Sequence, residues 1–188
     1  MRGLAGRRGV TLAIAVVLWA VPVVAQAEAG AAACGGRGQA PAAATDHELR
    51  TSVLCLLNQV RENHGIPPLE FNESLRRSAS VHSVSMVRSR TLSHYGPGGS
   101  TVLIRVARAG YLASASRFRV AENIGAGAGQ EFGSPRAIVS AWMQSPGHRE
   151  NILDRGLRDF GVGVAQGNPY GHDRNAATYT VDFGTRWH

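Results

Sequence analysis

The sequence predicts an α+β domain in which helices pack on a small antiparallel sheet. Apolar residues recur at helical spacing in the first part of the domain, from about residue 45 onward. Near the C-terminus the pattern changes to alternation, which is clearest in Ala177–Phe183. The turn-rich segment 166–176 separates that run from an earlier one, so we expect the chain to end in a hairpin with a long loop.

Residues 1–27 have the form of a secretory signal peptide. Three arginines precede an apolar run over residues 10–24, and Ala25-Gln26-Ala27 offers a cleavage site of small residues. The run is short for a membrane span and contains Pro22. We therefore expect a secreted protein with no transmembrane segment after cleavage, exported by the general or the twin-arginine route.

Composition separates the rest of the chain into a linker and one domain. Residues 28–44 are rich in Gly and Ala and lack large apolar side chains, which predicts a low-complexity linker before a domain over 45–188. All 20 basic residues are arginines and the net charge is +7, but the arginines are scattered. This distribution argues against a nucleic-acid partner and favours, at most, loose contact with anionic cell-wall polymers.

The two cysteines predict a single disulfide. Cys34 lies in the predicted linker and Cys55 in the first predicted helix, on its outer side. In an exported chain such a pair favours a bridge between the linker and that helix. The alternative is a lipoprotein acylated at Cys34, which would leave Cys55 unpaired.

The first two helices have clear start signals. Thr45 and Glu48 have the spacing of a capping box, and the helix that they begin should end near Gly65. Asn72 can cap a second helix, in which His82 falls on the apolar stripe. We interpret His82 as a core histidine.

The later elements follow similar signals. A short helix is expected over 101–109, and Ser134-Pro135 begins another that stops at Ser145-Pro146. Strands are expected over 119–124 and 160–164, the second with one crowded face because of its alternating glycines. The segment 125–129, Gly-Ala-Gly-Ala-Gly, is interpreted as a flexible loop.

Sequence templates for catalysis are absent, since the chain has no lysine and no C-x-x-C or G-x-S-x-G motif. Three polar residues lie in or near predicted turns and element ends: His94 in Ser-His-Tyr-Gly-Pro-Gly, Glu122 in Ala-Glu-Asn-Ile, and His148 after Ser-Pro-Gly. Taken alone, each histidine is most simply a hydrogen-bonded turn residue. Glu122 lies among apolar neighbours and must either face solvent or find partners.

Seven motifs in order give the chain a family resemblance. They are "LLNQVRENHGIPPLEFNESLRRSASVHSVSM", "SHYGPGG", "RVARAGY", "AENIGAG", "AWMQSPGHRENIL", "GVGVA" and "YTVDFG", between about Leu54 and Gly184. In this order they resemble bacterial members of the CAP superfamily, the cysteine-rich secretory, antigen 5 and pathogenesis-related proteins. The resemblance implies an α-β-α sandwich in which a three-stranded antiparallel sheet lies between helical layers.

The resemblance also implies a site. Members of the family bring two histidines and two glutamates to a central cleft, and His94, Glu122 and His148 match three of these groups. Ser145 stands where the second glutamate is usual, which weakens any mechanism that needs paired carboxylates. Two histidines and one carboxylate can hold a divalent metal such as zinc, with a position left for water. In the same motifs Ser93, Asn123 and Trp142 are expected to support the site.

Three functions are compatible with this site. The favoured one is a non-enzymatic extracellular binding module, expected to be monomeric, whose cleft holds a metal or polar ligand. The second is a metal-assisted hydrolase of cell-wall or other extracellular material, with Glu122 or a metal-bound water as base and a histidine such as His148 as acid. The third is a sterol or fatty-acid carrier. The partner is accordingly expected to be a cell-wall polymer, a lipid or a protein.

Overall fold

The computed structural model describes residues 34–188, so the signal peptide predicted over 1–27 and the first part of the linker lie outside the described residues. Four strands form one sheet: β1 Glu70–Phe71, β2 Arg117–Ala128, β3 Asp159–Gln166 and β4 Ala176–Trp187. Their order is β1-β3-β4-β2. The three long strands are antiparallel, as expected, but β1 pairs parallel to β3, which makes the sheet mixed.

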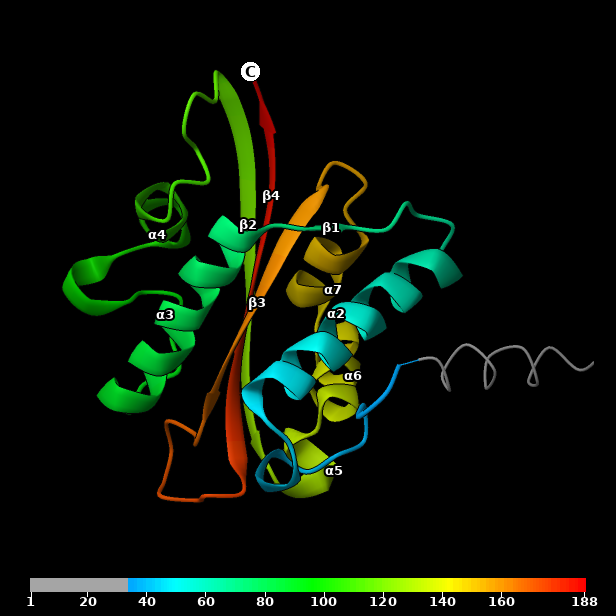
Figure 1. The fold of residues 1–188 in the computed structure, drawn as a ribbon, viewed down its shortest axis with the longest axis vertical. Coiled ribbons are helices and arrows are strands. Elements are labelled where there is room, and N and C mark those ends of the chain that lie inside the picture. The colour runs from blue at the N-terminus through cyan, green and yellow to red at the C-terminus, as the bar shows by residue number, and fades with distance from the viewer. Residues whose placement is uncertain (1–33) are drawn as a thin grey trace, which may run out of the picture.

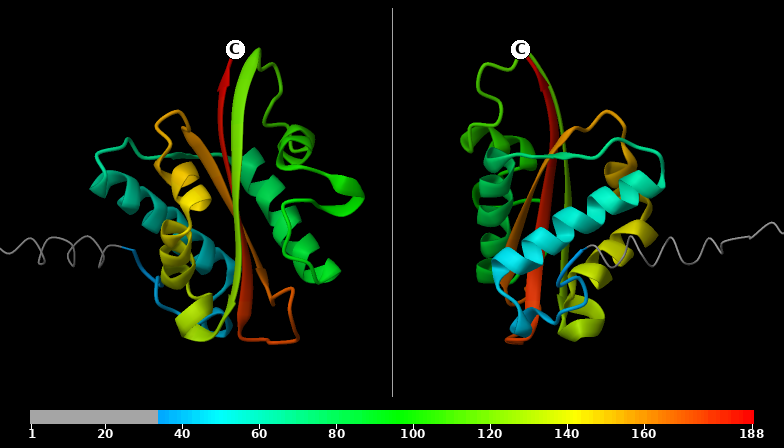
Figure 2. Two further views of the ribbon diagram at one scale, coloured as in Figure 1. Left: turned by 180° about the vertical axis from the view of Figure 1, so that it is seen from behind. Right: turned by 45° about the vertical axis from the view of Figure 1, so that its right-hand side comes forward.

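Helices cover both faces of the sheet, as the ribbon shows (Figure 1). On one face lie α3 (Glu73–Ser89) and α4 (Val102–Arg108). The helices α2 (Asp46–Asn63), α5 (Gly129–Gly133), α6 (Pro135–Gln144) and α7 (Pro146–Leu153) lie on the other face, and the view from behind shows the same division (Figure 2). Two 3-10 turns complete the chain: η1 (Pro41–Ala43) and η2 (Pro97–Gly99). The predicted α-β-α sandwich is confirmed.

The predicted helix caps are present. Thr45 and Glu48 form the capping box at the start of α2, and the Asn72 side chain accepts hydrogen bonds from two main-chain amides at the start of α3. Thr101 and Ser134 cap α4 and α6 in the same way. Among the described helices, none is long and apolar enough to cross a membrane.

The two faces of the sheet differ in character. Toward α2, α6 and α7 the packing is apolar and includes Leu57, Trp142, Phe160 and Phe183. The alternation in β4 predicted a strand, which is confirmed, and because β4 is a central strand, Asp182 and its polar neighbours are buried beneath α3. The α3 side of the sheet is therefore a buried polar layer.

The glycines of β3 allow α3 to lie directly on the strand. A Cβ atom added at Gly161 would come within 2.0 Å of the Arg76 amide nitrogen, and one at Gly163 within 2.2 Å of the Ala79 carbonyl carbon. The alternate residues Val162 and Val164 pack into the apolar core. This confirms the expectation that one face of the strand is crowded.

Two local expectations are wrong. The segment 125–129 is not a flexible loop, because β2 continues to Ala128 and pairs with β4 throughout. There Gly127 leaves room for the main chain of Phe132, whose carbonyl oxygen would lie 2.0 Å from an added Cβ atom. His148 is not in a turn, because Pro146 begins a new helix and places His148 in the first turn of α7.

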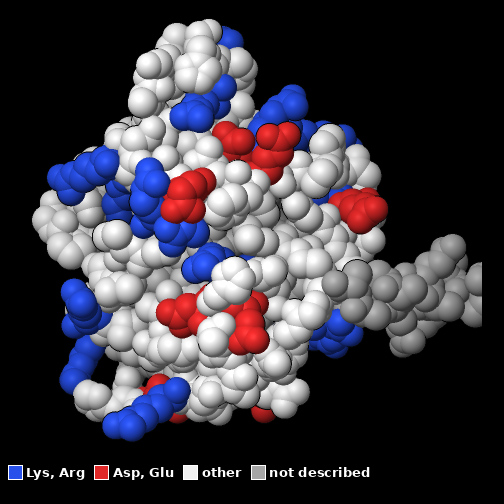
Figure 3. All heavy atoms as spheres, viewed as in Figure 1, with Lys and Arg blue, Asp and Glu red and all other residues white. Residues whose placement is uncertain are grey.

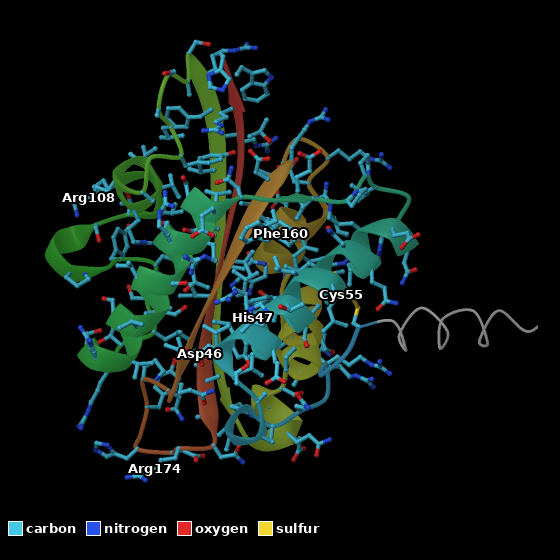
Figure 4. The ribbon with its side chains drawn as sticks, in the orientation of Figure 1. Asp46, His47, Cys55, Arg108, Phe160 and Arg174 are labelled. Carbon is cyan, nitrogen blue, oxygen red and sulfur yellow. A yellow bond between two sulfur atoms is a disulfide. The ribbon has the colours of Figure 1, made fainter. Side chains whose placement is uncertain are left out.

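The predicted disulfide joins Cys34 and Cys55, with a Cα–Cα distance of 5.6 Å. Figure 4 shows it as the yellow bond beside Cys55, on the outer side of α2. The part of the predicted linker that is described is packed onto the domain, since Cys34 and Pro41 are both buried. The main-chain amide of Ala42 also donates to the Asn175 side chain. Composition missed this packing because a covalent bond and single hydrogen bonds, not large apolar side chains, hold the segment.

The contact between α3 and β3 leads to a stability prediction. Gly161→Ala should lower the free energy of unfolding by at least about 2 kcal/mol, because its methyl group has no space beneath α3. The matched control is Gly147→Ala in α7, where an added Cβ atom meets nothing within 4 Å. That variant should be unchanged or more stable by about 0.5–1 kcal/mol. Equal urea-unfolding curves for both variants would contradict the packing described.

Candidate functional site

Glu122 is the centre of a buried group of charged side chains. It lies in β2, the edge strand, and only 2% of its side chain is exposed. His94, in the loop after α3, brings Nδ1 to 2.8 Å from Glu122 Oε1, while 53% of its own side chain remains exposed. Sequence reasoning placed both residues in the site, and the structure brings them into direct contact.

Arg105 occupies the other carboxylate oxygen. Its Nη2 donates to Glu122 Oε2, and its Nη1 donates to the main-chain oxygens of Ser100 (2.6 Å) and His94 (3.1 Å). Only 6% of the Arg105 side chain is exposed. Arg105 therefore stabilises the ionised form of Glu122 and holds the loop that carries His94 in place.

His82 completes the group from α3. Its Nε2 lies 2.9 Å from the Ser93 main-chain oxygen and 3.7 Å from Glu122 Oε2. Burial lowers the pKa of His82, although the charge of Glu122 opposes this effect. His82 is buried, as predicted, but it also positions the loop next to His94. Gly96 lies against it, since an added Cβ atom would be 3.6 Å from His82 Nδ1.

The ionisation of Glu122 follows from these contacts. Burial alone would raise its pKa. The hydrogen bond with His94 and the positive charge of Arg105 outweigh burial, and the pKa is lowered overall. Glu122 is thus an ionised carboxylate with both oxygens in use.

His148 approaches the same region from the other side of β2. Its main-chain oxygen accepts a hydrogen bond of 3.1 Å from Asn123, and its ring centroid lies 6.4 Å from that of Trp142. Burial and the nearby charge of His94 lower the pKa of His148. Within residues 34–188 its ring forms no hydrogen bond with Glu122 or His94.

The expected supporting residues make the contacts that hold these elements on the edge strand. Trp142 donates from Nε1 to the main-chain oxygen of Ile124 (2.9 Å), and Asn151 donates to that of Glu122 (3.3 Å). Asn151 also donates to the Asn123 side chain at 2.9 Å. Side chains of α6 and α7 thus bind main-chain carbonyls of the edge strand. Ser93 acts through its main-chain oxygen, as the partner of His82.

A three-ligand metal centre does not fit the described arrangement. Both Glu122 oxygens are engaged, one of them by an arginine, which competes with a cation for the carboxylate. In the described part of the chain, no three His, Cys, Asp or Glu residues are placed so that they could hold a metal ion. These contacts do not support the metal site of His94, Glu122 and His148, which stays a prediction.

A second carboxyl group lies next to Glu122, but not at the position that the resemblance considers. Ser145 joins α6 to α7, whereas Asp182 of β4 is the strand partner of Glu122 and is fully buried. Neither Asp182 oxygen has a hydrogen-bond partner among the described residues. Burial and the charge of Glu122 raise the pKa of Asp182 well above its usual value. We therefore treat Asp182 as a neutral acid.

Sequence reasoning missed Arg105, Asp182 and Asn151. Asp182 had a visible signal, a lone acid in an alternating strand, but alternation alone does not show which side of a strand is buried. Arg105 lies in a short helix whose apolar stripe could not show that a charge faces inward. Asn151 acts through the strand edge, which only the sheet order reveals.

Comparison with known proteins places this arrangement in a family. Residues 54–183 match the family described as CAP, the cysteine-rich secretory protein family. Two uncharacterized proteins of Bacillus subtilis are similar: YkwD, at 32% identity over 127 residues, and the membrane protein YlbC, at 28% over 135 residues. The matches cover 68% and 72% of this chain. They cover only 46% and 34% of those proteins, so the chain spans less than half of their length.

Solved structures show the same fold. An extracellular SCP-domain protein from Bacillus anthracis superposes with a TM-score of 0.58 at 24% identity, over 74% of this chain and 43% of that one. An outer surface protein of Borrelia burgdorferi gives 0.57 at 21%, over 72% and 90%. A cysteine-rich secretory protein from Staphylococcus aureus gives 0.52 at 17%, over 74% and 38%.

The buried ion pair gives a pH-dependent prediction. Arg105→Gln should destabilise the fold by about 3 kcal/mol at pH 7, because it leaves the Glu122 charge buried without its partner. The wild-type pKa of Glu122 is lowered, so its contribution is present above the unfolded pKa and is lost on acidification. In the variant burial raises that pKa, so Glu122 is neutral at pH 4 and the loss should be smaller there.

Urea unfolding at both pH values tests this prediction. The matched control is Arg119→Gln, which removes the exposed ion pair with Asp154 and should cost less than about 1 kcal/mol at either pH. A loss in Arg105→Gln that does not depend on pH would contradict the assigned role of Glu122.

Asp182→Asn should be tolerated, because the amide resembles the neutral acid in shape. We expect a change within about 1 kcal/mol at pH 4, against about 3–5 kcal/mol for loss of a buried paired charge. The pKa of Asp182 is raised on folding, so the wild type loses stability as the pH rises toward that value. The variant does not titrate, and its stability relative to the wild type should increase from pH 4 to pH 7. The opposite trend would show that Asp182 is ionised.

Proposed function

Because the chain belongs to the cysteine-rich secretory protein family, CAP, we propose that it is an exported, non-enzymatic module that binds a polar ligand through His94 and His148. Three observations support export. The N-terminal sequence has the form of a signal peptide, the two cysteines form a disulfide, and proteins of the same fold are described as extracellular or outer-surface.

The observation that carries the binding role is the full engagement of Glu122. A general base needs a carboxylate oxygen within reach of a substrate proton. Glu122 has its oxygens bound to His94 and Arg105, its side chain is buried, and its pKa is lowered. These properties suit a fixed structural anion and do not suit the hydrolytic base considered from the sequence.

The same contact orients His94 for binding. With Nδ1 donating to Glu122, the neutral ring has its lone pair on Nε2, and the ring is held in one orientation. His148, whose pKa is lowered, is neutral at physiological pH and offers a second imidazole close by. Two imidazoles in one region, that of His94 oriented by Glu122, suit a ligand that donates hydrogen bonds or accepts nitrogen lone pairs.

Zinc binding is a direct test for imidazole nitrogens of this kind. Titration of the chain without residues 1–27 by calorimetry should show one saturable event at pH 7, because zinc binds neutral imidazole. His94→Ala and His148→Ala should each weaken it at least about tenfold. Glu122→Gln should weaken it less, because Glu122 orients His94 and is not a direct partner.

The control for the zinc titration is His47→Ala, since His47 is exposed on α2, where Figure 4 labels it. This variant should bind zinc like the wild type. Zinc uptake that persists equally in His94→Ala and His148→Ala would overturn the assignment. So would a wild type that takes up no zinc and whose His94 and His148 imidazole NMR signals do not change when zinc is added.

A further inference from the structure

One stretch of the chain carries positive charge and no negative charge. Between residues 74 and 121 the sequence has eight arginines and no aspartate or glutamate. The stretch forms most of α3, the loop with the η2 turn, α4 and the start of β2. Figure 3 shows basic side chains spread along the side where Figure 1 places α3 and α4. Arginines that are scattered in the sequence are therefore concentrated on one side of the folded domain.

Half of these arginines have no acidic partner. Four of the eight are paired with the carboxylates of Glu73, Glu122 and Asp154. The other four are exposed and form no ion pair within the described residues: Arg88, Arg90, Arg108 and Arg117. Asp173 lines a pocket at the end of α3, but three arginines line it as well. The side that carries α3 and α4 therefore has an excess of positive charge.

The same stretch exposes large apolar side chains. Six of the ten that are exposed among the described residues belong to it, although it is the smaller part of the described chain. They are Val81, Val84, Tyr95, Leu103, Ile104 and Phe118. Val81 is 67% exposed and Tyr95 is 69% exposed. Single apolar groups are normal on a protein surface, but a cluster of them indicates a contact site.

The apolar and basic side chains share one continuous surface. Two hollows on this side of the sheet are both lined by Val81 and Pro97. One of them extends to Arg108 of α4, and the other extends to Val84 and Arg88 of α3. Val81 therefore lies between unpaired arginines of two helices.

The adjoining loop and α4 extend this surface. Tyr95 lies just before η2, and Leu103 and Ile104 are exposed on α4, whose next two residues are buried. We call this surface the α3–α4 face, and define it by Val81, Val84, Tyr95 and Ile104 together with Arg88 and Arg108. It combines unpaired positive charge with exposed apolar groups.

A lipid bilayer with anionic headgroups matches both properties. Headgroup phosphates attract arginine side chains, and apolar side chains among them can enter the boundary between headgroups and acyl chains. Tyrosine is favoured at that boundary. A soluble anionic polymer would engage the arginines but leave the apolar side chains in water. A second copy of the chain would bring two positive surfaces together.

We propose that the α3–α4 face binds the surface of an anionic phospholipid bilayer. Arg88 and Arg108 contact the headgroup phosphates, while Val81, Tyr95 and Ile104 reach the apolar boundary beneath them. This contact goes beyond the binding of a polar ligand proposed above and does not depend on it. Because Tyr95 follows His94 in the chain, docking holds the first binding site close to the membrane surface.

The test is flotation with lipid vesicles of the chain without residues 1–27, because the apolar run over 10–24 would itself enter a bilayer. Vesicles of phosphatidylglycerol and phosphatidylcholine in equal parts should bind the chain. High salt should weaken this binding, since it screens exposed charges. Vesicles of phosphatidylcholine alone should bind at least about tenfold more weakly.

Variants at exposed positions separate the two parts of the contact. Arg108→Gln should weaken binding to the anionic vesicles about fivefold. The double variant Val81→Ser and Ile104→Ser should weaken it at least about threefold, because it removes apolar groups and no charge. The matched controls lie on the other face of the sheet: Arg136→Gln in α6 and Phe132→Ser in α5, both at exposed side chains. Both controls should bind like the wild type.

Failure of the anionic vesicles to bind the chain would overturn the proposal, as would wild-type binding by Arg108→Gln. Wild-type binding by the double apolar variant would show that the bilayer is not the partner. Binding of soluble polyphosphate by that variant would then identify an anionic polymer instead. Zinc is absent from these measurements, so either result leaves the role of His94 and His148 to its own test.

Discussion

The buried ion pair between Arg105 and Glu122 is the interaction on which the candidate site depends. A carboxylate in the interior is unfavourable unless a partner and hydrogen bonds compensate for lost hydration. Arg105 supplies that partner, and its remaining hydrogen bonds fix the main chain at Ser100 and His94. One side chain thus keeps Glu122 ionised and sets the loop from which His94 reaches it. The position of His94 therefore follows from the hydrogen bonds of Arg105, the side chain that compensates the buried charge of Glu122.

The pair is possible because the two sides of the sheet are built differently. The layer beneath α2, α6 and α7 is apolar and holds the main core. The layer beneath α3 contains serines, threonines and charged groups; the Ser83 hydroxyl, for example, donates to the Gly163 main-chain oxygen and is hydrogen-bonded with the Thr180 hydroxyl. The glycines of β3 allow α3 to approach closely enough for such short polar side chains to meet. The main apolar core therefore lies in one layer, and the buried ion pair of Arg105 and Glu122 lies in the other.

The sequence predicted the elements that local signals define and missed those that depend on the sheet order. Caps at Thr45 and Asn72 were correct because each involves residues within one helical turn. The resemblance placed His94, Glu122 and His148, but not the way in which they meet. The burial of Asp182 could not be predicted, since alternation alone does not distinguish an edge strand from a central strand covered on both sides. Arg105 could not be predicted, because its partner lies in another element.

Asp182 bears on the absence of the second glutamate that the family resemblance implies. Ser145 removes one carboxyl group from the expected set, and Asp182 brings another next to Glu122, yet the two are not equivalent. Asp182 lies beneath α3, fully buried and opposite Glu122 in the sheet, where two adjacent negative charges would repel each other. Arg105 contacts Glu122 and favours the charge there, while burial and the charge of Glu122 favour the proton on Asp182. The site therefore holds one fixed anion, which orients the His94 imidazole, and one neutral acid.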